Sequence, residues 1–561
     1  MAILRNKLLF FTTSPRTPEK MIPEINLLIQ EFSGKKWNHS VQEQFADSLK
    51  DSNFFLGKGS SKDKAFSARD RINRAPKALG FVDLKPVIQL TEAGNQFVYG
   101  KRPRETFLRQ LLKFQLPSPY HKESRNEGGN FFIRPYLEIL RLIYELRYIT
   151  FDEFKIFAVQ LTNFHEFNKI KSLILQFREE KTKPKGIYKR YMNQLWTDQI
   201  LKIYRTRIEA GKTRTRETKD NSLKKFILTQ KGNMRDYTDA CFRYLRYTGL
   251  ISIKHQSKSI SIFEDKIRDV EFILKTVPRE PVFTDDEKGY KAYLFNSNIP
   301  ELYVDDKENI IDILMKIGSF TKRELVNKSI EDLKDLRDKI VQKNKAAIIS
   351  KEILNIKSYA LYSEIIDTFN EIISDGYYDA PLMLEYNTWR AMTMIDGGRI
   401  KGNFNFDDAG KPLSTAAGNM PDIECDYDSF SLSVEVTMQQ GHKQYEMEGE
   451  PVARHYGQMK RKQNKETYCL FIAPSVNEST YAHFYGLNHC NIKYYGGKTK
   501  IIPLELAQFM KLVEISYVYK GHPTSKDIKE FLDGVIAECD NSINEIQWEQ
   551  AIQTCVDRWL M

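Results

Sequence analysis

Apolar residues recur at helical spacing through most of the first 377 residues, and short alternating segments interrupt that pattern. The first helical stretch follows Ser14 and continues to about residue 57, with Pro15 expected at the first helical position. Strand-like alternation becomes prominent only further along, at 422–437 and again near 469–474 and 498–503. The pattern therefore predicts a largely helical N-terminal part and a C-terminal part built around a sheet.

A short basic helix is predicted within 66–80, and a strand, a turn and a second strand follow it at 82–90. The helix carries four cations: Arg69, Arg71, Arg74 and Lys77. Thr91 then begins another helix. A basic helix followed by a hairpin is typical of a winged-helix module, which inserts its helix into a DNA groove. A solvated charged helix is the alternative, and the hairpin placed directly after the helix favours DNA binding.

Helical geometry separates these arginines. Arg71 and Arg74 are three residues apart and share a face, whereas Arg69 lies on another side. We therefore predict that Arg71 and Arg74 contact DNA. Arg69 is expected to point toward a phosphate or an internal carboxylate such as Asp70 or Glu92.

A second unit, in which a hairpin again follows a helix, is predicted over 131–265. Thr150 and Glu153 have the spacing of a capping box. The end of the unit combines a helix over 236–248 that carries Arg243 and Arg246, Gly249 after it, and alternating strands at 250–254 and 259–262. The Lys- and Arg-rich stretch 179–225 either binds phosphates or forms a flexible basic loop.

The remaining segments complete a division into four parts. Prolines and acidic residues over 277–300 are typical of a linker, and 301–377 is helical and highly charged. The sequence thus predicts two DNA-recognition subdomains at 1–130 and 131–285. A helical linker at 286–377 and a catalytic domain at 378–561 follow them.

A predicted hairpin places two carboxylates opposite each other. Strands at 422–427 and 430–437 flank a two-residue turn, and that turn pairs Asp422 with Glu435. Opposed Cβ atoms lie about 5 Å apart, so the two charges would repel unless a cation such as Mg²⁺ bridged them. Exposed strand carboxylates are the alternative. Val434 beside Glu435 indicates a partly buried strand, where a carboxylate needs a partner.

Composition narrows the class of protein. The chain is 41% hydrophobic, which excludes wholesale disorder. Its length of 561 residues predicts about three or four domains. The net charge of +11 suits a polyanion-binding surface beside a separate acidic centre. Six dispersed cysteines without a Cys-x-x-Cys pair argue against structural zinc and disulfides, and indicate a reducing cytoplasm. No apolar run is long enough to span a membrane.

Pro421-Asp422 followed by Glu435-Val436-Thr437 resembles the PD-(D/E)xK nuclease motif, with threonine at the lysine position. A larger set of segments is similar to the AlwI family of type IIS restriction endonucleases, most of all its MlyI- and PleI-like members: 13–20, 67–71, 243–249, 418–422, 434–437, 446–456 and 469–474. The likeness covers essentially the whole chain. It implies a multidomain α+β protein with winged-helix-like recognition subdomains, a helical linker and a C-terminal α/β nuclease core with a mixed sheet.

The resemblance also implies an activity. Such an enzyme is bacterial and cytoplasmic, binds a short asymmetric double-stranded DNA site (here GAGTC-like) and hydrolyses phosphodiester bonds a few base pairs to one side. It needs Mg²⁺, for which Mn²⁺ can substitute. A transient homodimer or a small catalytic subunit would cut the second strand, and a DNA methyltransferase would act on the same site. A strand-specific nicking enzyme or the large subunit of a heterodimer is the alternative. A non-catalytic DNA-binding regulator is less favoured because the carboxylate pair is intact.

Residue roles follow from the same resemblance. Asp422 and Glu435 become metal ligands, with the Val436 carbonyl as a third, and Glu448 and Glu385 become further catalytic acids. Among the matching N-terminal segments, Arg16, Lys20, Arg243 and Arg246 are expected to contact DNA, as is Lys77 of the basic helix. Glu385 and Glu448 could instead be ordinary solvated glutamates. Thr437 leaves the proton acceptor open, and we favour water activated by the metal and assisted by Glu448. His455 is interpreted as structural.

Overall fold

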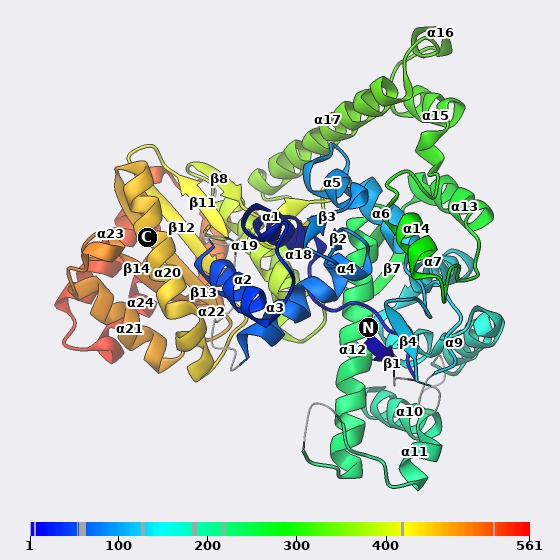
Figure 1. Ribbon diagram of the computed structural model, residues 1–561. Helices are drawn as coiled ribbons and strands as arrows, with labels where there is room; N and C mark the ends of the chain where they lie inside the picture. The colour runs from blue at the N-terminus through cyan, green and yellow to red at the C-terminus, as the bar shows by residue number, and fades with distance from the viewer. Residues whose placement is uncertain are drawn as a thin grey trace. The chain divides into compact units, whose positions relative to one another are not determined.

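The computed structural model describes residues 2–4, 7–52, 54, 63–124, 129–181, 188–215, 219–416, 420–519 and 522–561. The chain forms two compact units (Figure 1). Unit 1 comprises 1–254 and 258–337, and unit 2 comprises 255–257 and 338–561. The division into four parts stays a prediction. Residues 418 and 419 of the matching motif and parts of 179–225 lie outside the described residues.

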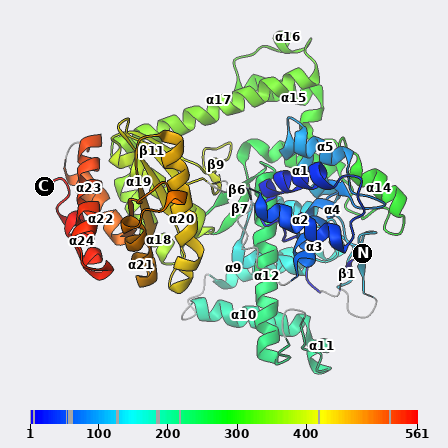
Figure 2. The same cartoon turned by 60° about the vertical axis from the view of Figure 1, so that its left-hand side comes forward.

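Unit 1 is mostly helical. Its helices are α1 (Met21–Phe32), α2 (His39–Asp51), α3 (Lys64–Asn73), α4 (Ala75–Ala78), α5 (Glu92–Tyr99), α6 (Pro103–Lys113), α7 (Pro135–Leu146), α8 (Phe151–Ile156), α9 (Phe167–Lys181), α10 (Tyr188–Ile203), α11 (Arg205–Glu209), α12 (Leu223–Tyr247), α13 (Ile267–Thr276), α14 (Glu287–Phe295), α15 (Lys307–Ile317) and α16 (Lys322–Leu325), with 3-10 turns η1 (Pro18–Lys20), η2 (Ala158–Gln160), η3 (Phe164–Glu166), η4 (Glu264–Lys266) and η5 (Tyr303–Asp305). The helix α17 (Ile330–Lys357) begins in unit 1 and continues into unit 2. Figure 2 shows α12 and α17 as long continuous helices. None of the described helices is both long and apolar enough to cross a membrane.

Three small sheets complete unit 1. Strand β1 (Ala2–Leu4) runs parallel to β4 (His121–Glu123), and β2 (Val82–Asp83) pairs antiparallel with β3 (Gln89–Leu90). The third sheet has the order β5 (Tyr148–Thr150), β7 (Ser259–Ile262), β6 (Ile251–Lys254). The predicted hairpins at 82–90 and 250–262 are therefore confirmed, and β5 joins the second one from a distant part of the chain.

Several helix starts follow from local sequence. Side chains accept a backbone N–H at the N-termini of α2, α3, α5, α8 and α12: Asn38, Asp63, Thr91, Thr150 and Ser222. The capping box of Thr150 and Glu153 is confirmed. The first helix, however, does not begin at Pro15. Thr17 is extended, the 3-10 turn η1 follows it, and α1 begins only at Met21. The Pro15 carbonyl accepts a hydrogen bond from the Tyr244 hydroxyl at 2.7 Å.

Unit 2 is built around a mixed sheet of five strands in the order β14-β13-β12-β11-β8. Its strands are β8 (Arg399–Gly402), β11 (Ile423–Asp426), β12 (Phe430–Val436), β13 (Glu466–Ala473) and β14 (Ile501–Glu505), beside the small pair β9 (Asn405–Phe406) and β10 (Pro412–Ser414). Its other elements are α18 (Tyr362–Ile373), α19 (Ala380–Ile395), α20 (His442–Gln463), α21 (Glu478–His489), η6 (Lys493–Tyr495), α22 (Leu506–Val518), α23 (Ser525–Asn541) and α24 (Glu545–Asp557). Strands β12, β13 and β14 are parallel, and β11 and β8 are antiparallel to their neighbours.

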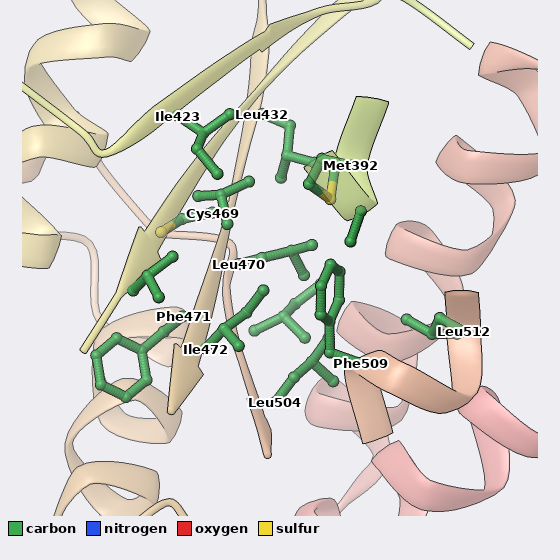
Figure 3. Packing of buried hydrophobic residues seen from close by; sticks show 14 of the residues in the cluster. Met392, Ile423, Leu432, Cys469, Leu470, Phe471, Ile472, Leu504, Phe509 and Leu512 are labelled. Carbon is green, nitrogen blue, oxygen red and sulfur yellow. The ribbon is translucent and has the colours of Figure 1, made fainter. Parts of the chain in front are cut away.

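Helices cover both faces of this sheet. On one face, Leu470 and Leu504 pack with Met392 of α19 and Phe509 of α22 (Figure 3). On the other face, α20 packs against β12 and β13, and the ring of Phe471 lies 5.3 Å from that of Phe484 in α21. Because every residue of β12 is buried, the strand that carries Glu435 is the centre of the core.

The hairpin register is confirmed. Ile423 pairs with Val434, and Asp426 pairs with Ser431. The same register places Asp422, just before β11, opposite Glu435. Asp428 has a positive φ of 62°, which the two-residue turn requires.

Candidate active site

The end of the β11–β12 hairpin holds the two predicted carboxylates. Asp422 is half-buried, and its Oδ2 accepts a hydrogen bond from the Val436 backbone N–H at 2.8 Å. Its own carbonyl accepts from the Asn403 backbone at 2.9 Å. Glu435 is only 7% exposed. The hairpin therefore fixes both carboxylates, one at its edge and one inside the core.

Helix α20 adds two further groups on the same side. Nδ1 of His455 lies 2.9 Å from Oε1 of Glu435, and the Thr437 hydroxyl donates to Oε1 of Glu448 at 2.8 Å. Glu448 and His455 are seven residues apart, two helical turns, and so share one face of α20. Nε2 of His455 is buried and has no hydrogen-bond partner among the described residues.

Helix α19 contributes Glu385, which is 7% exposed. Its Oε2 is buried and has no hydrogen-bond partner among the described residues. The interpretation of Glu385 as a solvated glutamate is therefore wrong. Glu448 is half-buried, and the Thr437 hydroxyl holds its position.

The electrostatics of this group disfavour ionised carboxylates. Burial, followed by repulsion from Glu435, raises the pKa of Asp422 well above its ordinary value. Burial, followed by repulsion from Glu448, does the same to the pKa of Glu435. Burial and then the charge of Asp422 raise the pKa of Glu385. Burial also lowers the pKa of His455 to about 4, which keeps the imidazole neutral.

A divalent cation fits this donor set. Among the described residues no three His, Cys, Asp or Glu side chains stand ready around one ion. The predicted ligands are two carboxylates, Asp422 and Glu435, and the Val436 carbonyl, and hard cations such as Mg²⁺ complete their shell with water and phosphate oxygens. The unpartnered oxygen of Glu385 and the mutual repulsion of the carboxylates both call for positive charge at this place.

His455 and Thr437 are the groups whose contacts the sequence-based interpretation missed. His455 was interpreted as structural, yet its ring contacts Glu435 directly. One signal could have revealed it, because the spacing of seven from Glu448 puts both side chains on one face of a helix. No pattern in the sequence shows that Thr437 bonds to Glu448.

The three candidate DNA-contacting arginines lie in unit 1 and bond to protein groups. Arg69 and Arg71 belong to α3, whereas Arg74 follows the last residue of α3, because the predicted basic helix is divided into α3 and α4. Arg71 pairs with Glu24, which is buried. Arg74 pairs with Asp70 at 2.5 Å. Arg69 bonds to Gln42 at 2.8 Å and lies 3.8 Å from Asp63.

Arg69 faces an internal carboxylate, as expected, but this carboxylate is Asp63 and not Asp70 or Glu92. Asp70 precedes Arg74 by one helical turn and pairs with it instead. Glu92 bonds to the Ser297 hydroxyl at 2.5 Å. The DNA contacts of this helix stay a prediction.

The other predicted DNA-contacting cations also lie in unit 1. Arg16 has a side chain that is 69% exposed, and Lys20 is exposed as well. Arg243 pairs with Asp239 on α12 at 3.1 Å. Arg246 is only 5% exposed. The ammonium of Lys77 lies 4.8 Å from the centre of the Tyr120 ring.

The mixed sheet thus places an aspartate and a glutamate opposite each other across its antiparallel hairpin, and α19 and α20 bring the acidic residues Glu385 and Glu448 to the same place. The model of the AlwI restriction endonuclease family matches residues 77–512. The chain belongs to this family, and it is a type II site-specific deoxyribonuclease. No curated protein matches the chain.

The solved structures to which the chain is similar include three of restriction endonucleases or their parts. The small subunit R.BspD6I2 of the heterodimeric restriction endonuclease R.BspD6I is 27% identical, with a TM-score of 0.31, and the match covers 35% of this chain and 99% of that one. The BpuJ1 endonuclease binding domain, solved with pyrene- and phenanthrene-modified DNA, is 14% identical with a TM-score of 0.34. The match covers 52% of this chain and 98% of that one. The restriction endonuclease FokI is 12% identical with a TM-score of 0.25, and the match covers 94% of this chain and 99% of that one.

Proposed function

We propose that unit 1 binds a short asymmetric double-stranded DNA site, GAGTC-like, and that unit 2 hydrolyses phosphodiester bonds a few base pairs to one side. The observation that carries this proposal is the cluster of Asp422, Glu435 and Glu385 at one end of a single hairpin. The predicted DNA-contacting cations all belong to unit 1. The expected setting is the cytoplasm of a bacterium, with a DNA methyltransferase acting on the same site.

Asp422, Glu435 and the Val436 carbonyl would hold Mg²⁺, or Mn²⁺ in its place. When bound, the cation polarises the scissile phosphate, lowers the pKa of water and stabilises developing negative charge. It would also relieve the repulsion that raises the pKa of Asp422 and Glu435. The positive charge that catalysis requires would thus also stabilise the ionised carboxylates of the cluster.

One side chain of the same site would accept a proton, and another would hold a carboxylate in place. Glu448, oriented by the Thr437 hydroxyl, is placed to assist deprotonation of the attacking water. His455, whose imidazole is buried and neutral, keeps its Nδ1 2.9 Å from Oε1 of Glu435 and would fix the position of that carboxylate. Thr437 therefore acts by holding Glu448, a different role from that of a motif lysine.

Digestion of DNA tests the proposal. Plasmid incubated with the full chain and Mg²⁺ should give discrete products, and a chelator should abolish them. Sequencing the product ends then gives both the recognised site and the cut offset. Specific binding without cutting at any concentration of divalent ion would instead identify a DNA-binding regulator.

A second candidate function is strand-specific nicking. The hairpin of unit 2 brings one such carboxylate cluster together, and one site cuts one strand at a time. Double-strand cleavage would then need a transient homodimer or a small catalytic subunit. Open circles that persist without becoming linear, at any enzyme concentration, would identify a nicking enzyme or a large subunit.

A further inference from the structure

An exposed arginine projects from a tightly held loop of unit 1. The side chain of Arg16 is 69% exposed, whereas Pro15 and Pro18 on either side of it are buried. The backbone of the loop is fixed from two directions. The Tyr244 hydroxyl donates to the Pro15 carbonyl at 2.7 Å, and the Ala75 N–H donates to the carbonyl of Ser14 at 3.2 Å. A rigid loop that exposes one long cation is suited to contact a ligand from outside.

A carboxylate of α12 holds this arginine by one edge. Oδ2 of Asp239 accepts from Nε of Arg16 at 2.7 Å and from Nε of Arg243 at 3.1 Å. The Asp239 side chain is 11% exposed, so it is fixed within the fold. Asp239 and Tyr244 belong to the same helix. One helix therefore sets both the backbone of the loop and the direction of the guanidinium.

The bond to Nε leaves the far side of the guanidinium open. No described residue forms a hydrogen bond with the two terminal nitrogens of Arg16. A guanine edge presents two acceptors, O6 and N7, that match two such donors. Fixing the guanidinium in advance also reduces the entropy lost on binding.

We propose that Asp239 is a positioning residue for DNA recognition, which orients Arg16 toward a guanine base in the major groove. This inference rests on the proposed function of unit 1 as the DNA-binding part. If Asp239 only forms an ordinary ion pair with Arg243 along the helix, the opposite effect on DNA affinity is expected. On that reading, a carboxylate near DNA only repels phosphates, and its removal should strengthen binding to every sequence.

The test compares Asp239→Asn with a matched control, Asp236→Asn. Asp236 lies one turn earlier on α12, is 62% exposed and faces Arg235 at 3.7 Å, so its replacement removes the same charge without touching Arg16. Binding of the full chain is measured with Ca²⁺, on the cognate duplex and on single-base variants, at two salt concentrations. Asp239→Asn should lose about ten- to a hundredfold in cognate affinity. Its affinity for unrelated DNA should be unchanged or higher, as in Asp236→Asn.

Two further variants complete the test. Arg16→Ala should show the same loss at the same base pair, and the double variant should lose no more than either single one. Arg235→Ala, at an exposed position of the same helix that pairs with Asp236, should keep the discrimination. The inference would be overturned if Asp239→Asn and Asp236→Asn raised the affinity for all DNA sequences equally. It would also be overturned if the losses of cognate affinity in the two single variants added up in the double variant. Absence of any specific binding by the wild type would instead overturn the proposed function.

Discussion

Thr437 occupies the lysine position of the nuclease motif, and its hydroxyl has two partners. It donates to Glu448 at 2.8 Å and accepts from the Gln439 backbone N–H at 3.1 Å. Thr437→Val keeps the shape and loses both bonds. We expect cleavage to fall by about 10- to 100-fold while DNA binding is unchanged. Thr437→Ser keeps the hydroxyl and should cleave at close to the wild-type rate. Equal cleavage rates for the two variants would contradict this role.

A buried carboxylate of unit 1 should make stability depend on pH. Burial raises the pKa of Glu24 to about 7 despite its pairing with Arg71. Because the folded pKa lies above the unfolded value, the folded state holds the extra proton between about pH 4.5 and 7. Stability therefore falls as pH rises through that window, by at most about 3 kcal/mol.

Urea unfolding of Glu24→Gln at several pH values measures this term. The difference in the free energy of unfolding between the wild type and the variant should change from pH 4.5 to 7 and be constant above pH 7. Glu43→Gln, an exposed position of α2, serves as the control and should follow the wild-type curve. A Glu24→Gln curve parallel to the wild type would contradict the account.

At the residue scale, sequence alone identified the carboxylate pair but not its surroundings. Asp422 and Glu435 were predictable because a two-residue turn fixes their register. The burial of Glu385 was not predictable, because its helix packs against strands from other parts of the chain. The pairing of Arg71 with Glu24 joins residues 47 positions apart, and no local pattern encodes it.

At the scale of elements, charged pairs anchor the first turns of α17 to α6. Arg102 pairs with Glu331 at 2.6 Å and with Asp335, and its side chain is only 12% exposed. Lys101 pairs with the same Asp335 at 2.8 Å but is 74% exposed. Arg102→Ala should therefore lower the free energy of unfolding by about 1–2 kcal/mol, and Lys101→Ala should lower it by clearly less.

Hydrogen exchange locates the effect of these variants. Amides at the start of α17 should exchange faster in Arg102→Ala than in Lys101→Ala, because the loss is confined to the anchored turns. High salt should further reduce the effect of Lys101→Ala on the free energy of unfolding. Equal effects of the two substitutions would show that burial does not decide the strength of these pairs.

Elements defined by local signals were predictable, and their long-range pairings were not. The capping box at Thr150, the β6–β7 hairpin and the register of β11 with β12 all depend on residues a few positions apart. The addition of β5 to β7, and of β8 to β11, depends on tertiary packing. The first helix begins later than the sequence predicts, because the preference of proline for a first helical position carries no information on contacts with distant residues such as the hydrogen bond from Tyr244 to Pro15.

At the scale of the whole molecule, recognition and cleavage are proposed to belong to separate units. Deleting residues from about 380 onward removes the sheet of unit 2 and leaves unit 1 intact in sequence. The shortened chain should still discriminate the cognate duplex from substituted ones in a binding assay, and it should not cleave. A soluble, folded fragment without specific binding would place part of the recognition surface in unit 2.

We propose that the β11–β12 hairpin carries Asp422 and Glu435 as the catalytic carboxylates of a site-specific nuclease. The most direct measurement compares Asp422→Ala and Glu435→Ala with Glu424→Gln, a half-buried position two residues after Asp422 on the same hairpin. Both alanine variants should lose cleavage by at least about 100-fold and still bind the cognate site in Ca²⁺ as the wild type does, while Glu424→Gln should cleave normally. Cleavage by either alanine variant at a rate comparable to the wild type would contradict the account.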